Sequence, residues 1–93
     1  MIIQIDYQNI TEDNKEKIIK YSLIKEKFKK KFIYGVLIEK INSNKVIEEA
    51  EEVLGVSDNI EIIKKLFFEI RNFSVTPITL LNVVDNFISE INS

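Results

Sequence analysis

Carboxylates are the most numerous side chains able to do chemistry in this sequence, which holds four Asp and eleven Glu but neither His nor Cys. Without His, the chain lacks the usual acid/base group at neutral pH and the commonest metal ligand. Without Cys, it has neither thiolate zinc ligands nor a disulfide framework. Gly35 and Gly55 are the only glycines, so there is no glycine-rich phosphate loop. These absences predict a non-catalytic protein that holds no metal or cofactor.

The acidic residues are concentrated in the second half of the chain. Residues 46–93 hold nine acidic against three basic side chains, whereas residues 1–45 hold ten Lys against six acidic side chains. The two halves therefore carry net charges of −6 and +4. This split predicts surfaces of opposite sign.

The densest acidic segment is expected to form a helix over residues 44–54. Its outward side chains, with two acids just beyond the following turn, form a candidate partner-binding site: Glu48, Glu49, Glu51, Glu52, Asp58 and Glu61. Like charges on one helix face repel, so their presence opposes folding slightly. One interpretation is an acidic docking face for a basic protein partner, because such charge raises association rate and selectivity. The alternative is that these acids only solubilise the helix, or pair with the lysines of residues 25–31.

Phe68 is the second candidate for partner binding. On a helix over residues 59–72, it lies roughly 150° from the mean direction of the apolar face, counted at about 100° per residue. Either a bundle covers both sides of this helix, or Phe68 is exposed and marks a contact surface.

Apolar periodicity predicts a mainly α-helical bundle of four to five helices in a single domain, residues 1–93. Residues 1–7 alternate loosely and are expected to form a short strand or an extended arm. Residues 32–42 suit either a strand that pairs with this arm or a helix, and we favour the helix because four apolar residues match helical spacing. The expected helices are 11–31, 32–42, 44–54, 59–72 and 77–91.

Capping residues support these helix ends. Thr11 is expected to cap the first long helix, and Asp58 with Glu61 resembles a capping box. Thr76 followed by Pro77 is typical of a helix start. The core expected for the bundle comprises Ile18, Phe28, Val53, Leu54, Ile63, Leu66, Phe67, Val84 and Phe87.

Residues 48–63 read EEAEEVLGVSDNIEII, which resembles a helix-turn-helix DNA-binding motif. In that motif a Gly begins the turn and the residue four positions earlier is small, but here Glu51 precedes Gly55 by four. Glu61 and Lys64 occupy positions where the second helix should pack inward. Duplex DNA binding rests mainly on Lys and Arg, whereas this segment is acidic. A small helix-turn-helix-like DNA-binding regulator is therefore only an alternative function.

Residues 54–66, LGVSDNIEIIKKL, and residues 83–91, VVDNFISEI, resemble the region around the prosthetic-group serine of acyl and peptidyl carrier proteins. In that family an Asp or His precedes the serine and an apolar residue follows it. Here Val56 precedes Ser57 and Asp58 follows. A Ser before a helix is also ordinary capping chemistry. The resemblance implies a carrier-like or docking domain of a biosynthetic assembly line as a further alternative.

Neither a signal peptide nor a membrane span is expected. The N-terminus has no basic region, and no apolar run approaches the roughly 20 residues that a span needs. Lysines within residues 25–31 would scatter around a helix, so they form no stripe for nucleic acid or a membrane. We therefore expect a cytoplasmic protein with no specific nucleic-acid partner and no membrane partner.

A stoichiometric inhibitor is the function that these observations favour. The chain is acidic overall, with a net charge of −2, and offers no catalytic groups. Its many Ile, Asn and Lys residues are typical of AT-rich coding, as in many bacteria and phages. We therefore expect a bacterial immunity or antitoxin protein, or a phage anti-host protein, that covers the basic surface of its partner.

Overall fold

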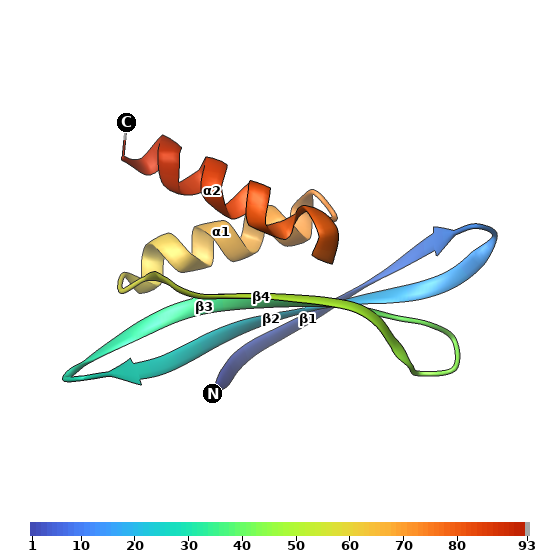
Figure 1. Ribbon diagram of the computed structural model, residues 1–93, viewed down its shortest axis with the longest axis horizontal. Helices are drawn as coiled ribbons and strands as arrows, with labels where there is room; N and C mark the ends of the chain where they lie inside the picture. Colours follow the sequence, from blue (N-terminus) through green and yellow to red (C-terminus); the bar gives the residue numbers. More distant parts are fainter. Residues whose placement is uncertain (93) are drawn as a thin grey trace.

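The computed structural model describes residues 1–92 and shows a four-stranded antiparallel sheet followed by two α-helices. The strands lie side by side in sequence order: β1 (Ile2–Glu12), β2 (Lys15–Phe28), β3 (Lys31–Ile41) and β4 (Ile47–Ser57). The helical segments that follow are α1 (Ile60–Asn72), the 3-10 helix η1 (Pro77–Thr79) and α2 (Leu80–Ile91). Both α-helices lie on one side of the sheet (Figure 1). The protein is thus a two-layer α+β domain.

The predicted helical bundle is wrong, because the first half of the chain forms a sheet. The expected helices 11–31, 32–42 and 44–54 correspond to β2, β3 and β4. Residues 1–7, expected as a short strand or an extended arm, form part of the strand β1, and residues 32–42 form the strand that was the less favoured alternative. The last two helices are confirmed as α1 and as η1 running into α2, with Pro77 at the start of η1. Pairing between strands overrides the helical preference of the acidic segment, because β propensity depends on cross-strand packing that local periodicity does not report.

Turn residues explain why the strands begin and end where they do. Asp13 and Asn14 both have positive φ, 53° and 63°, as a two-residue hairpin turn requires, so they join β1 to β2 instead of starting a helix. Lys29, with φ 58°, lies in the turn between β2 and β3. In the third turn, the side-chain oxygen of Asn42 accepts a hydrogen bond from the amide of Asn44 at 2.9 Å.

The core lies between the sheet and the two helices. Alternate residues of β2 and β3 face the helices, which contribute their own apolar stripes. The buried cluster comprises Ile19, Tyr21, Leu23, Tyr34, Val36, Ile38, Ile63, Leu66, Phe67, Ile70, Val75, Leu80, Val84 and Phe87. The five core residues predicted on α1 and α2 are confirmed. Ile18, Phe28 and Leu54 are instead exposed, and Val53 is only partly buried against the cluster.

Polar contacts fix the C-terminal end of α1 over β1. The Tyr21 hydroxyl donates to Gln8 Oε1 at 3.4 Å, and Gln8 Nε2 donates to Ser74 Oγ at 2.6 Å. Arg71 lies 3.6 Å from Asp6 of β1. Burial raises the pKa of Tyr21 to about 12, so its hydroxyl stays a donor at neutral pH.

Asn59, and not Asp58, caps the N-terminus of α1. Its side-chain oxygen accepts hydrogen bonds from the amides of Glu61 at 2.9 Å and Ile62 at 3.3 Å. Asp58 instead lies 3.3 Å from Lys31 Nζ. The two α-helices contain 13 and 12 residues, and within residues 1–92 none is long and apolar enough to cross a membrane.

Gly35 is expected to be essential for the contact between β3 and β4. A Cβ at this position would collide with the carbonyl oxygen of Val53 and lie 2.8 Å from the Cα of Leu54. We predict that Gly35→Ala lowers the free energy of unfolding by about 1–3 kcal/mol, the usual cost of overpacking, in urea denaturation. Gly55→Asn is the control, because Asn tolerates the positive φ of 65° and an added Cβ meets only Ile33, at 3.8 Å. Equal losses in the two variants would contradict this explanation.

Candidate functional site

The structure divides the predicted acidic face between the two sides of the sheet. Four of its residues lie on β4, an edge strand, where side chains alternate between sides. Pairing with β3 places Glu49 and Glu51 on the side of the helices and Glu52 on the opposite side. The four glutamates therefore do not form one continuous surface.

Two of these glutamates belong to a cluster of charges drawn from all four strands. This ion cluster consists of Glu12, Lys17, Lys40, Glu48 and Glu49. Lys17 Nζ lies 3.0 Å from Glu12 and 2.6 Å from Glu48. Lys40 Nζ lies 2.9 Å from Glu12 and 2.5 Å from Glu49. Glu12 therefore bridges the two lysines, and Glu48 and Glu49 of β4 are neutralised by lysines of the same chain.

The lysines of the ion cluster are shielded from solvent. The Lys40 side chain is 6% exposed and the Lys17 side chain 11%. Hydrogen bonds donated to Glu49 and Glu12 raise the pKa of Lys40, and those donated to Glu48 and Glu12 raise the pKa of Lys17. The same bonds lower the pKa of Glu12, through Lys40 and then Lys17, and Lys17 lowers the pKa of Glu48. These four groups are consequently all ionised at neutral pH.

The ion cluster spans a fork in the sheet. Pairing between β2 and β3 ends at Ile18 and Ile41, and beyond this point the β1–β2 and β3–β4 hairpins diverge, as the right of Figure 1 shows. Charge pairs therefore connect strands where backbone pairing is absent. The pairs that link the two hairpins are Glu12–Lys40 and Lys17–Glu48.

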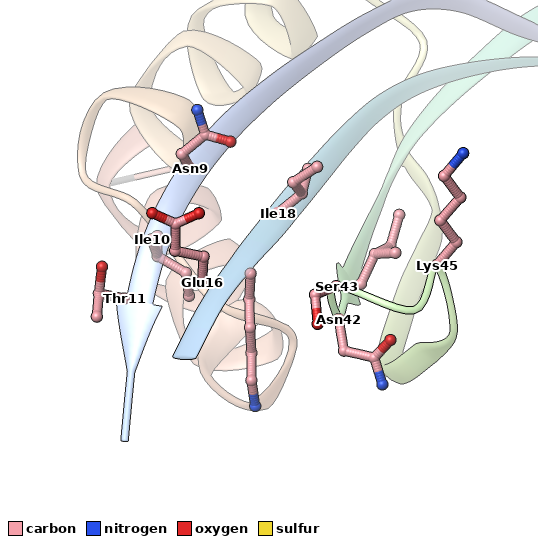
Figure 2. Close-up of a pocket in the computed structure, with 10 residues that line it drawn as sticks. Asn9, Ile10, Thr11, Glu16, Ile18, Asn42, Ser43 and Lys45 are labelled. Carbon is pink, nitrogen blue, oxygen red and sulfur yellow. The ribbon is translucent and has the colours of Figure 1, made fainter. Parts of the chain in front are cut away.

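A pocket of about 390 Å³ lies in this fork (Figure 2). Its apolar lining consists of Ile10, Ile18 and Ile41. Its polar lining consists of Asn9, Thr11, Glu16, Lys17, Asn42, Ser43 and Lys45. Such a lining suits a side chain with an apolar body and a polar end. Within residues 1–92, no three carboxylates are grouped as a metal site would require.

The side of the sheet opposite the helices, termed the open face, carries several exposed apolar side chains. Ile19, Tyr21 and Leu23 of β2 face the core, so the residues between them, and their partners on β1 and β3, lie on the open face. Its exposed apolar side chains, between 38% and 63% accessible, are Ile2, Ile5, Tyr7, Ile18, Ile47 and Leu54. Ser22 and Ile24 lie buried among them.

Sequence reasoning missed the open face, although β2 carries a signal for it. Adjacent residues are both apolar at Ile18-Ile19 and at Leu23-Ile24. Neighbours on a strand point to opposite sides, so apolar pairs of this kind are typical of a strand covered on both faces. Treating the segment as a helix merged the two sets of residues into one apolar stripe.

The remaining predicted site residues do not gather at one place. Within the described chain, Glu51, Glu52 and Glu61 form no ion pair, and Asp58 pairs with an exposed lysine. Phe68 is 55% exposed on α1, with the Arg71 guanidinium 5.8 Å from its ring centre. It therefore belongs to the helical layer, whereas the open face lies on the other side of the sheet.

Within residues 1–92, the structure does not contain the elements that the helix-turn-helix resemblance requires, and it gives the serine of the carrier-protein resemblance a turn role. Gly55 lies within β4, so the segment expected as the first helix of a helix-turn-helix is a strand. Ser57 ends that strand, and its Oγ accepts a hydrogen bond from the amide of Asn59 at 3.0 Å. Ser57 thus has the turn role that its position before a helix suggested.

The ion cluster predicts a specific dependence of stability on pH. A carboxylate whose pKa is lowered by folding stabilises the protein above its unfolded pKa, near 4.5, and this contribution is lost as pH falls through the lowered value. We predict that Glu12→Gln is less stable than wild type at pH 7, and that the difference disappears well below pH 4.5. The lysines act at the other end of the pH scale. Their contribution to the stability of the fold is complete below their unfolded pKa of 10.5 and is lost as pH rises through the raised pKa of the folded state.

Urea unfolding of both proteins, from pH 7 down to about pH 2, measures this difference. Glu61→Gln is the matched control, because Glu61 forms no ion pair within residues 1–92. A gap between wild type and Glu12→Gln that stays constant over the whole range would show that the ion cluster does not stabilise the fold.

Comparison with known proteins gives a family. A search of curated proteins found no match, and a search of solved structures found none either. A protein-family model described as a family of unknown function, DUF6514, matches residues 1–90. Because this match covers almost the whole sequence, the chain belongs to the DUF6514 family.

Proposed function

We propose that the protein is a non-catalytic binding module that docks a protein partner on the open face of its sheet. The observation that carries this proposal is that the sheet is apolar on both sides, while its helices lie on only one side (Figure 1). An antiparallel sheet with one solvated face ordinarily places polar residues there. A contiguous exposed apolar patch ordinarily marks an interaction site.

The dimensions of the open face suit a protein interface. Four strands about 4.8 Å apart, over about eight residues at roughly 3.3 Å each, give a surface of roughly 500 Å². Typical stable interfaces bury about 800 Å² of accessible surface per partner. Accessible surface follows the outline of the side chains, so it is larger than the flat area of the same patch, and the two values are compatible. Tyr7, 63% exposed, is the type of residue that often anchors such interfaces.

Charges near the open face favour a partner with a basic surface. Glu39 and Glu52 lie on this side of the sheet, and Lys20 is opposite Glu39 in the register of β2 with β3. These acids replace Glu48 and Glu49, which the ion cluster already engages, as the candidate electrostatic contacts. They would raise the association rate with a basic partner.

We propose that docking inhibits the partner. A module of this kind, when bound over a basic active site or a nucleic-acid-binding surface, would block access to it. The chain would need no catalytic group for this role, in keeping with its lack of His and Cys. An immunity, antitoxin or anti-host protein acts in this way.

The test is a comparison of two glutamate substitutions on opposite sides of the protein. Partners are first captured with the wild-type protein from its source organism, and the purified partner is then titrated by calorimetry. Leu54→Glu puts a charge into the open face at a residue 44% exposed, and we predict that it weakens binding at least about tenfold, or about 1.4 kcal/mol. Phe68→Glu, at a residue 55% exposed on α1, should leave binding unchanged.

Thermal unfolding of both variants provides the control for folding. Because both side chains are partly exposed, neither substitution should unfold the domain. Loss of binding in Phe68→Glu with full binding in Leu54→Glu would transfer the site to the helical layer. It would also reject the open face as the docking surface.

A further inference from the structure

We infer that β1 is a pairing edge through which two copies of this chain join antiparallel about a two-fold axis. The two four-stranded sheets would then form one continuous eight-stranded sheet. The inference concerns the edge of the sheet and stands independently of the function proposed for the open face.

The outer side of β1 offers a long row of free backbone groups. β1 is an edge strand of 11 residues, and its ladder partner is β2 alone. Within residues 1–92, no backbone hydrogen bond reaches the outer side of β1 from a turn or a helix. An unpaired edge of this length is a template for another strand.

β1 also lacks the free charges that usually prevent edge pairing. Its only charged side chains are Asp6 and Glu12. Asp6 lies 3.6 Å from Arg71, and Glu12 pairs with Lys17 and Lys40 in the ion cluster. Both carboxylates are therefore engaged on the helix side by the same chain, which leaves apolar and uncharged polar residues along the edge.

The opposite edge of the sheet, β4, is protected against pairing with another strand, whereas β1 is not. β4 carries two glutamates that form no ion pair within residues 1–92, Glu51 and Glu52, and its pairing with β3 is irregular at both ends. η1 and α2 also pack against β4. Charge, irregular pairing and coverage by other elements are the usual means of blocking edge-to-edge association. The chain applies all three at β4, and at β1 it has only one irregularity, between Ile2 and Gln4.

The sequence of β1 suits pairing with itself when Tyr7 lies on the two-fold axis. Tyr7 would then face Tyr7 of the second copy, and cross-strand aromatic pairs are stabilising. Asp6 would face Gln8, and Ile5 would face Asn9, so no like charges oppose each other. The irregularity beside Gln4 limits the pairing to the strand beyond it. Both copies would keep their helices on the same side, and their open faces would adjoin.

The first experiment measures the mass in solution by light scattering at tens of micromolar protein. We expect twice the monomer mass of 10.9 kDa for the wild type. Tyr7→Lys places two cations opposite each other on the axis, so it should give the monomer mass. Tyr7 is 63% exposed, so the fold should survive, and Phe73→Lys, at a residue 73% exposed on the helical side, should remain a dimer.

The second experiment traps the register with single cysteines, which is possible because the chain has none of its own. In an antiparallel pair, residues on the axis have Cα atoms about 4.5–5.5 Å apart, within disulfide range. Tyr7→Cys should therefore form a covalent dimer on mild oxidation. Asn9→Cys, whose copies would lie roughly 13 Å apart at about 3.3 Å per residue, should not. Glu52→Cys on β4 should also stay monomeric under denaturing conditions.

Each other outcome overturns the inference. A wild-type protein of monomer mass would reject the dimer. A dimer that survives Tyr7→Lys but is dissociated by Leu54→Lys would place the contact between open faces and not between edges. Cross-linking through Asn9→Cys in preference to Tyr7→Cys would reject the proposed two-fold axis.

Discussion

A four-stranded sheet that is apolar on both sides, with helices on one side only, is the constraint on which the rest of this structure depends. The helical layer completes a core with the residues of β2 and β3 that face it. The opposite residues of the same strands keep apolar side chains at the surface. Burial of apolar surface is the main driving force for association, so the uncovered side is where a partner would stabilise the protein most.

The ion cluster links the two hairpins where the sheet divides. Beyond Ile18 and Ile41, β2 and β3 no longer pair, so the two hairpins lack backbone hydrogen bonds to each other. Lysines shielded from solvent are costly unless they are paired, and here each lysine contacts two carboxylates. The cluster thus connects the hairpins on the helix side, and it also occupies two of the acids that sequence alone assigns to partner binding.

The sequence was sufficient for the helices but not for the sheet. The helical spacing of Ile63, Leu66 and Phe67 and the Thr76-Pro77 start are local signals, and they predict α1, η1 and α2 closely. The identity of β4 depends on pairing with β3, which no local pattern encodes, and its glutamates have good helix propensity. Asp13 was instead expected in the first turn of a helix, whereas Asp13 and Asn14 form the hairpin turn between the first two strands.

The candidate site was predictable only in part, for the same reason. Sequence showed that acids gather within residues 48–61, yet register decides which of them face Lys17 and Lys40 and which remain free. The open face combines residues of four strands, so it cannot be recognised until those strands are aligned. For Phe68 the sequence left burial in a bundle and exposure at a contact surface as alternatives, and the structure shows the side chain 55% exposed.

If the open face is the docking surface, it is free in the isolated protein and covered in the complex. Methyl NMR with a soluble paramagnetic probe measures this directly for Ile18 and Ile47 on the open face, with Ile78, 76% exposed, as the reference on the helical side. We predict that the probe broadens all three methyl signals in the free protein. Saturation with the captured partner should shield Ile18 and Ile47 but not Ile78. Shielding of Ile18 and Ile47 in the protein without its partner, or shielding of Ile78 alone in the complex, would show that the open face is not the docking surface.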